Sequence, residues 1–125
     1  MQFTTQQDSL NKAASPQHMN PALRYDLITG ECTKAATKEV LAMYLEEHSL
    51  KGKVVLDNAC GSGVVTKELL HLEGQVREIE AVDISPAMIE ALQSYRPSPE
   101  ASTCKIGATV MDAGVFPLLF FTKYY

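Results

Sequence analysis

The segment VVLDNACGSGVVTKELL, from Val54 to Leu70, contains the pattern that decides the fold. The run from Lys53 to Leu56 is apolar and β-branched, which predicts a short buried parallel strand that ends on Asp57. A loop with two glycines comes next, and Val64 to Leu72 then places apolar side chains on one helical face. This segment therefore predicts a strand, a tight loop and a helix.

The same arrangement repeats further along the chain. Glu78 to Val82 predicts a second strand, again followed by an acid, Asp83. Ser85 is a preferred N-cap residue and Pro86 suits the first helical position, so we expect a helix from Ala87 to Tyr95. The chain thus contains two consecutive strand–helix units.

A third strand is predicted from Lys105 to Met111, directly before Asp112. Strands joined by helical crossovers form right-handed units in a parallel sheet. We therefore expect the α/β class, with a Rossmann-like doubly wound parallel sheet in strand order 3-2-1 and flanking helices.

The chain upstream of the first strand divides into two parts. Residues 1–20 are polar and Gln-rich, so we expect a flexible leader, and we assign residues 21–125 to one domain. Apolar residues at helical spacing predict a helix from Lys34 to His48 with Thr33 as its cap. Tyr25 is expected to be a core residue.

Composition excludes several classes of protein. The 125 residues carry a net charge of −4 and contain no block of Lys or Arg, which argues against nucleic acid as a partner. The three cysteines form no CxxC pair, so neither a disulfide framework nor a zinc or other metal site is expected. The sequence has no signal peptide and no stretch that would span a membrane, which predicts a soluble, cytoplasmic protein.

An acid closes each predicted strand, and a glycine loop follows the first. Ligands bind at the carboxyl ends of the strands in open parallel sheets, where Asp57, Asp83 and Asp112 would gather. Any single acid at such a place commonly caps the next helix. Gly61 and Gly63 tolerate positive φ and allow a ligand to approach the backbone. Together these residues predict a ligand site.

The residue types discriminate between ligands. A dinucleotide fingerprint requires a small residue where this sequence has Thr66, and Asp57 would repel the phosphates. S-adenosylmethionine has no phosphate, and its ammonium and sulfonium groups favour a nearby carboxylate. Asp83 is placed to accept hydrogen bonds from both ribose hydroxyls of that cofactor.

Three motifs carry a family resemblance. Val54 to Leu70 resembles the glycine-rich first motif of class I S-adenosylmethionine-dependent methyltransferases. AVDISPAMIEAL, from Ala81 to Leu92, resembles their second-strand motif, and Val110 to Ala113 resembles their short acidic motif after strand three. The likeness is greatest to the small-molecule branch, which includes quinone-biosynthesis and fungal secondary-metabolite enzymes. It covers the span from Leu50 to Ala113.

The resemblance implies a role for each matching residue. Asp57, Gly61 and Gly63 would hold the methionine end of the cofactor and Asp83 its ribose, while Ala59 replaces the first glycine of the family loop. The remaining expected contacts are with the adenine, whose ring would pack on Ile84 and Met88 and whose amino edge would meet Asp112 and Ala113. Spacing alone would make Met88 a core residue. Tyr25 and Thr33 lie in a stretch that often covers the cofactor in such enzymes, but a core tyrosine and a helix cap are the better interpretation.

The chain departs from the family at its end. Where the family continues with a fourth strand, Gly114 to Tyr125 is apolar and interrupted by Pro117, so we expect a C-terminally truncated chain with only the N-terminal half of the domain. The family sheet has the order 3-2-1-4-5-7-6, and its absent half would leave strand one as an exposed edge. No catalytic residue is assigned. Cys60 is expected to be a packing residue, not a nucleophile.

Three functions remain open at this stage. The first is a methyltransferase acting on a small-molecule methyl acceptor, with doubtful activity for this chain alone. The second is a non-catalytic assembly module that binds another chain, or another copy of itself, through its edge strand and the apolar tail from Phe116 to Tyr125. The third is a nucleotide-dependent oxidoreductase, which Asp57 and Thr66 disfavour.

Overall fold

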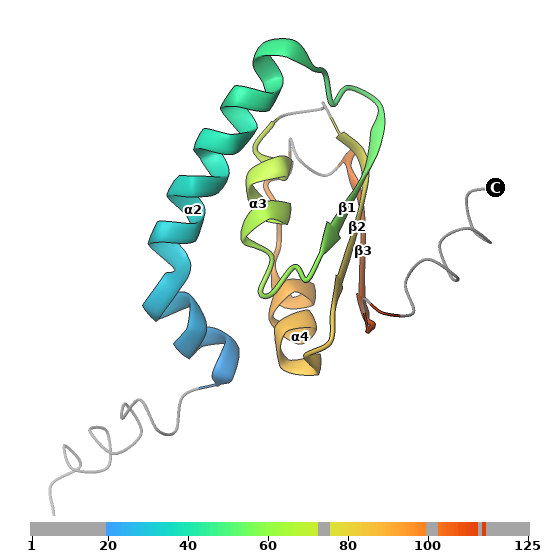
Figure 1. Ribbon diagram of the computed structural model, residues 1–125. Coiled ribbons are helices and arrows are strands. Elements are labelled where there is room, and N and C mark those ends of the chain that lie inside the picture. Colours follow the sequence, from blue (N-terminus) through green and yellow to red (C-terminus); the bar gives the residue numbers. More distant parts are fainter. Residues whose placement is uncertain (1–19, 73–75, 100–102, 113, 115–125) are drawn as a thin grey trace, which may run out of the picture.

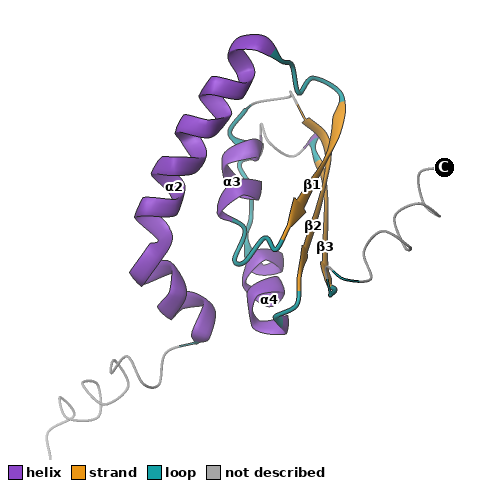
Figure 2. Cartoon of the chain, in the orientation of Figure 1, coloured by secondary structure: helices purple, strands orange, loops and turns teal. Residues whose placement is uncertain are grey.

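A computed structural model of the protein describes residues 20–72, 76–99, 103–112 and 114. Helices and strands alternate along the chain after one long helix (Figures 1 and 2). The elements are α2 (Pro21–Glu47), β1 (Lys53–Asn58), α3 (Val64–Leu70), β2 (Val76–Asp83), α4 (Pro86–Ser94) and β3 (Lys105–Val110). The expected leader lies outside the described residues except for Asn20, and the apolar tail from Phe116 onward lies outside them altogether.

The three strands form one open parallel sheet with β2 in the middle. β1 and β3 both pair with β2 in parallel, so that Asp57, Ala81 and Ala108 lie side by side across the sheet. This confirms the predicted α/β class and the order 3-2-1. In Figure 1 the three described helices lie on one side of the sheet.

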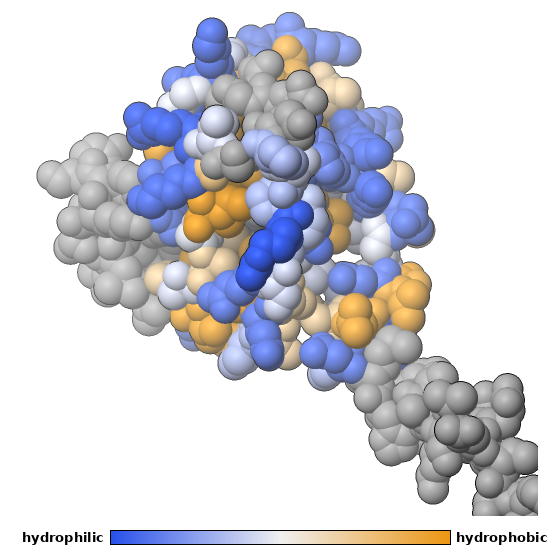
Figure 3. All heavy atoms as spheres, turned by 180° about the vertical axis from the view of Figure 1, so that it is seen from behind, coloured by the Kyte–Doolittle hydropathy of each residue, from blue (hydrophilic) through white to orange (hydrophobic). Residues whose placement is uncertain are grey.

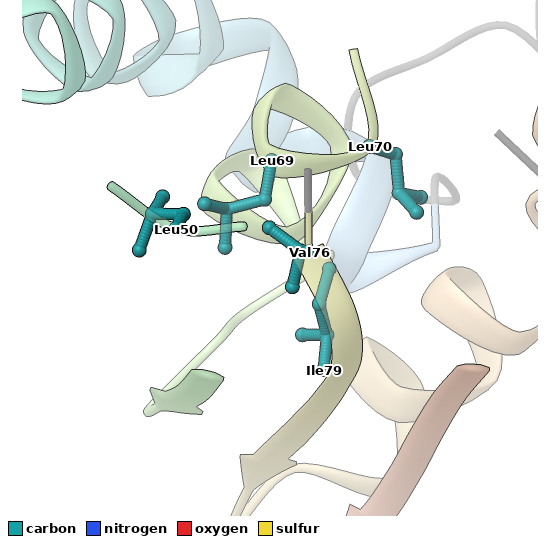
Figure 4. Packing of buried hydrophobic residues seen from close by; sticks show 5 residues of the cluster. All are labelled: Leu50, Leu69, Leu70, Val76 and Ile79. Atoms are coloured by element: carbon teal, nitrogen blue, oxygen red, sulfur yellow. The ribbon is translucent and has the colours of Figure 1, made fainter. Parts of the chain in front are cut away.

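The core lies between this face of the sheet and the helices. One cluster consists of buried residues from α3, β2 and the turn before β1, with Leu41 and Leu45 of α2 packed against it (Figure 4). Its buried members are Leu50, Leu69, Leu70, Val76 and Ile79. A second cluster joins Ile89 and Leu92 of α4 to Cys60 and Ala81. The first cluster packs α3 against β2, the central strand, and the second packs α4 against the same strand.

The first helix is longer than predicted. It starts at Pro21, and the side chain of Asn20 caps it by accepting a hydrogen bond from the Ala22 amide at 2.9 Å. Thr33 is therefore not a cap: it lies inside the helix, where its hydroxyl donates to the Thr29 carbonyl. The expected core position of Tyr25 is also wrong, since this side chain is 49% exposed.

Most of the other element ends differ from the predicted ones by one or two residues. β1 continues through Asp57 to Asn58, and β3 ends at Val110, one residue before the predicted end. The expected cap of α4 is confirmed, because the Ser85 hydroxyl accepts a hydrogen bond from the Met88 amide at 3.4 Å and Pro86 starts the helix. None of the described helices is long and apolar enough to span a lipid bilayer.

Two exposed features distinguish this fold from a closed one. Among the described strands, β1 pairs only with β2, so its other edge has no strand partner there. Helix α2 also carries large apolar side chains at its surface. On the face of the molecule drawn in Figure 3, hydrophobic residues lie in separate patches between hydrophilic ones. The most exposed on α2 are Leu27, Ile28, Val40 and Met43.

Candidate functional site

The loop between β1 and α3 has an unusual backbone. Gly61 and Gly63 have φ angles of 55° and 93°, as the sequence predicted, and Ala59 also has a positive φ of 58°. A Cβ atom at Gly63 would lie only 2.4 Å from Cδ1 of Leu92, whereas one at Gly61 would meet nothing within 4 Å. Gly63 is thus required for both its backbone angle and its lack of a side chain.

Hydrogen bonds fasten this loop to the end of β2. The Cys60 amide donates to the Val82 carbonyl at 2.9 Å, and the Gly61 amide donates to Oδ2 of Asp83 at 2.9 Å. The other oxygen of Asp83, Oδ1, accepts from the Ser85 amide at 2.8 Å. Each carboxylate oxygen has a further lone pair, so Asp83 retains capacity to accept from a ligand while it holds both loops.

Asp57 faces the start of α3. It is 7% exposed, and its Oδ2 accepts hydrogen bonds from the amide and the hydroxyl of Thr66 at 3.1 and 2.6 Å. Burial raises the pKa of Asp57 above its usual value, the two Thr66 hydrogen bonds lower it, and the charge of Asp83 raises it. In this structure the side chain caps the helix that follows the loop, which is the ordinary role of an acid after a strand.

A cavity of about 160 Å³ opens at the carboxyl ends of the three strands. Four residues predicted for the cofactor line it, namely Ala59, Asp83, Ile84 and Asp112. Asn58 and Met111 also line it and were not predicted. The Met111 amide donates to the Asp83 carbonyl at 2.9 Å, which brings the end of β3 beside that of β2.

The other predicted site residues lie around this cavity or outside it. Asp57, Gly61 and Gly63 are in or under the loop and do not line the cavity, and Met88 is half-buried in the first turn of α4. Asp112 is exposed and its Oδ1 accepts from the Gly114 amide at 2.8 Å. Ala113 lies outside the described residues. The neighbouring positions Asn58 and Met111 could have been found from their adjacency to the acids at the strand ends.

Cys60 has the properties of a packing residue. It is buried, and burial raises the pKa of its thiol to about 12, with smaller contributions from the charges of Asp57 and Asp83. A thiol with this pKa is almost wholly protonated at neutral pH and is a poor nucleophile. Among the described residues, no group of three or more His, Cys, Asp or Glu side chains could hold a metal ion.

A larger cavity lies elsewhere in the described structure. It has a volume of about 610 Å³ and lies between α2, the edge strand β1 and α3, with a mostly apolar lining. Residues such as Val40, Tyr44 and Leu56 form its walls. It does not include any of the acids at the strand ends, so size alone does not identify the ligand site here.

Neither a protein-family model nor a curated protein sequence matches this chain. Solved structures do resemble it. Magnesium protoporphyrin IX methyltransferase from Synechocystis PCC 6803, determined with bound SAM, is 20% identical, with a TM-score of 0.48 over 88% of this chain and 50% of that one.

Two further structures are also similar to this chain. Phosphoethanolamine N-methyltransferase 1 from Haemonchus contortus, in complex with phosphoethanolamine and S-adenosylhomocysteine, is 23% identical (TM-score 0.47; 89% of this chain, 21% of that one). A putative RNA methyltransferase from Pyrococcus horikoshii is 22% identical (TM-score 0.45; 58% and 35%). The likeness is one of fold. The chain spans no more than half the length of any of these three proteins.

Proposed function

We propose that this chain binds S-adenosylmethionine as the cofactor-binding part of a methyltransferase that acts on a small molecule. The observation that carries the proposal is the meeting of the glycine loop and the Asp83 carboxylate at one cavity at the strand ends. The glycines allow a ligand to approach the loop closely, and the two carboxylate oxygens of Asp83 can accept hydrogen bonds from a diol, which the sugar of a nucleoside presents. The proposed domain covers residues 21–125.

Each part of the cofactor has a proposed contact. Asp83 would accept from the ribose hydroxyls, and Ile84 and Met88 would pack on the adenine ring, whose amino edge would meet Asp112 and Ala113. Ile84 supports this role because an apolar side chain that is 69% exposed at the mouth of a cavity offers a surface for a ring. The loop with Asp57, Gly61 and Gly63 would hold the methionine end.

The charge of the site favours this cofactor over a phosphate-bearing one. Asp83 and Asp112 both line the cavity. Asp57 lies close enough to Asp83 for the charge of Asp83 to raise the pKa of Asp57. A pyrophosphate would be repelled by these carboxylates, while a sulfonium or ammonium group would be attracted. An oxidoreductase with a dinucleotide is therefore the weaker proposal.

When bound, the cofactor would supply an electrophilic methyl group, and the protein's main contribution would be to hold it in line with the acceptor. We assign no general base. The three unpaired cysteines support a reducing, cytoplasmic location as part of the proposal.

Calorimetric titration with S-adenosylhomocysteine tests the proposal. We expect saturable binding of one equivalent by the wild-type chain, and Asp83→Ala should weaken it by about 1–3 kcal/mol because a charge-assisted acceptor is lost. Ile84→Ser is the sharper variant, since its exposed side chain contributes little to folding. It should raise the dissociation constant while the melting temperature stays unchanged.

Glu90→Ala is the matched control, because it removes an exposed carboxylate from α4 away from the cavity. A folded wild-type chain that gives no binding heat would refute the cofactor proposal. A larger thermal shift with NADH than with S-adenosylhomocysteine would instead favour the oxidoreductase.

A second candidate function rests on a separate observation. One edge of β1 pairs with no strand among the described residues and lies beside the apolar cavity of about 610 Å³. An edge of this kind accepts a strand from another chain. The chain would then be a non-catalytic assembly module, with Phe116 to Tyr125 as a further apolar contact. Light scattering of the purified chain tests this: a monomer that binds S-adenosylhomocysteine would refute it, and a discrete oligomer or a co-purifying partner would support it.

A further inference from the structure

The glycine loop has a second support that the sequence did not reveal. Ser62 lies between Gly61 and Gly63, is only 2% exposed, and donates its hydroxyl proton to Oδ1 of Asp26 at 2.5 Å. Asp26 belongs to α2 and is 36 residues away in the sequence. An O–H···O distance of about 2.5–2.7 Å is typical of a charge-assisted hydrogen bond.

Within the described residues, this is the one side-chain hydrogen bond that links α2 to the loop. Gly61 and Gly63 have no side chains, and the thiol of Cys60 is used locally, since it donates to the Gly61 carbonyl. Ser62 is therefore the residue whose side chain connects the loop to α2. The loop is clamped on one side by Asp83 and on the other by Asp26.

We infer that Asp26 is a positioning residue for the cofactor loop, acting through Ser62. Both flanking glycines have positive φ and wide conformational freedom, so the segment keeps its shape only where hydrogen bonds hold it. The contact with Asp26 fixes Ser62 and, with it, the backbone of the loop that would meet the methionine end of the cofactor. This inference rests on the proposed cofactor role of the loop.

Affinity for S-adenosylhomocysteine tests the role in binding. Asp26→Ala and Ser62→Ala should each raise the dissociation constant about 3- to 10-fold, because each removes the same hydrogen bond. The double variant should show no further loss, since the two residues act as one unit. Asp26→Asn should restore affinity, because its amide oxygen can still accept from Ser62. Glu39→Ala, which removes an exposed carboxylate from the same helix, is the control.

Hydrogen exchange of the ligand-free chain separates positioning from general destabilisation. In Asp26→Ala the amides of residues 61–63 should exchange faster, while those of the central strand β2 keep their protection. If Asp26→Ala proves unstable, Asp26→Asn and Ser62→Ala allow the same comparison. Unchanged affinity and unchanged loop exchange in folded variants would overturn this inference alone. Absence of binding by the wild-type chain would overturn the cofactor proposal and this inference with it.

Discussion

Two boundaries of the sheet have opposite character: the carboxyl ends of its strands and the edge of β1 that pairs with no described strand. At the strand ends, the polar side chains of Asp57 and Asp83 accept hydrogen bonds that bind one segment to another. Along β1, the edge that pairs with no described strand lies beside apolar side chains of α2 and α3 at the cavity of about 610 Å³. At the strand ends, hydrogen bonds within the protein hold the polar side chains around a cavity. Along β1, one edge has no strand partner among the described residues, and apolar side chains line the neighbouring cavity.

This difference assigns the two boundaries to different kinds of partner. A small ligand needs fixed polar groups in a preformed cavity, and the strand ends provide both. A polypeptide needs an edge and an apolar surface, and β1 with its neighbouring cavity provides both. Changes at the strand ends should therefore alter folding and ligand affinity, and changes along β1 should alter association.

Removing the acid that holds the loop to α3 should have the largest effect. In Asp57→Ala the buried amide and hydroxyl of Thr66 lose their acceptor, so we expect the free energy of unfolding to fall by about 3 kcal/mol. Urea denaturation measures this. Glu90→Ala, which removes an exposed acid, should change stability little. An equal, small effect of both variants would mean that the strand ends are not braced as described.

The two glycines of the loop form a matched pair. Gly63→Ala should destabilise the chain by about 2–3 kcal/mol, because the new methyl group collides with Leu92 and the backbone is left-handed. Gly61→Ala meets no neighbour, so only the backbone term of about 1 kcal/mol remains. Melting temperatures of the two variants give the comparison. The reverse order would contradict the packing of α4 against the loop.

The pH dependence of stability should report the buried state of Asp57. Its pKa is raised in the folded chain above the usual 3.8, so its contribution to stability is fully present below that pH. It is then lost as pH rises through the folded pKa. Relative to the wild type, Asp57→Asn should therefore become more stable as pH is raised from about 4 toward 7. Urea denaturation of both proteins across this range checks the trend, and a constant difference would argue against burial as the main cause.

The smallest effect on folding is expected along β1. Leu56→Lys places a charge on the exposed edge strand and should change the free energy of unfolding by no more than about 0.5 kcal/mol. It should nevertheless reduce any self-association seen by light scattering. Leu27→Lys, at a more exposed position on α2 outside that cavity, is the control. If both variants associate like the wild type, the β1 edge is not the contact surface.

The order of strands and the glycine loop were predictable from local pattern. Short apolar runs that each end on an acid identify parallel strands, and glycines between a strand and a helix identify positive φ angles. The start of α2 was also readable, because Asn20 followed by Pro21 is a cap and a first-turn proline. The prediction that Thr33 caps this helix was wrong, because the helix already begins at Pro21.

The site's detailed contacts were not predictable in the same way. Asp57 pairs with Thr66 only because the loop closes back on the strand, and Met111 reaches the cavity because β3 ends beside Asp83. The contact of Asp26 with Ser62 joins segments 36 residues apart, and no local pattern marks either residue. The contact between Asp26 and Ser62 depends on how α2 packs against the loop, and no sequence motif predicts that packing.

Ala59 holds a left-handed conformation, with φ at 58°, where the family resemblance expects glycine. Alanine has fewer accessible conformations than glycine before folding, so the same turn is reached with less loss of chain entropy, at a steric cost of about 1 kcal/mol. A loop shaped in this way has little freedom left to lose when a ligand arrives. In calorimetry, Ala59→Gly should therefore bind S-adenosylhomocysteine with a more unfavourable entropy than the wild type.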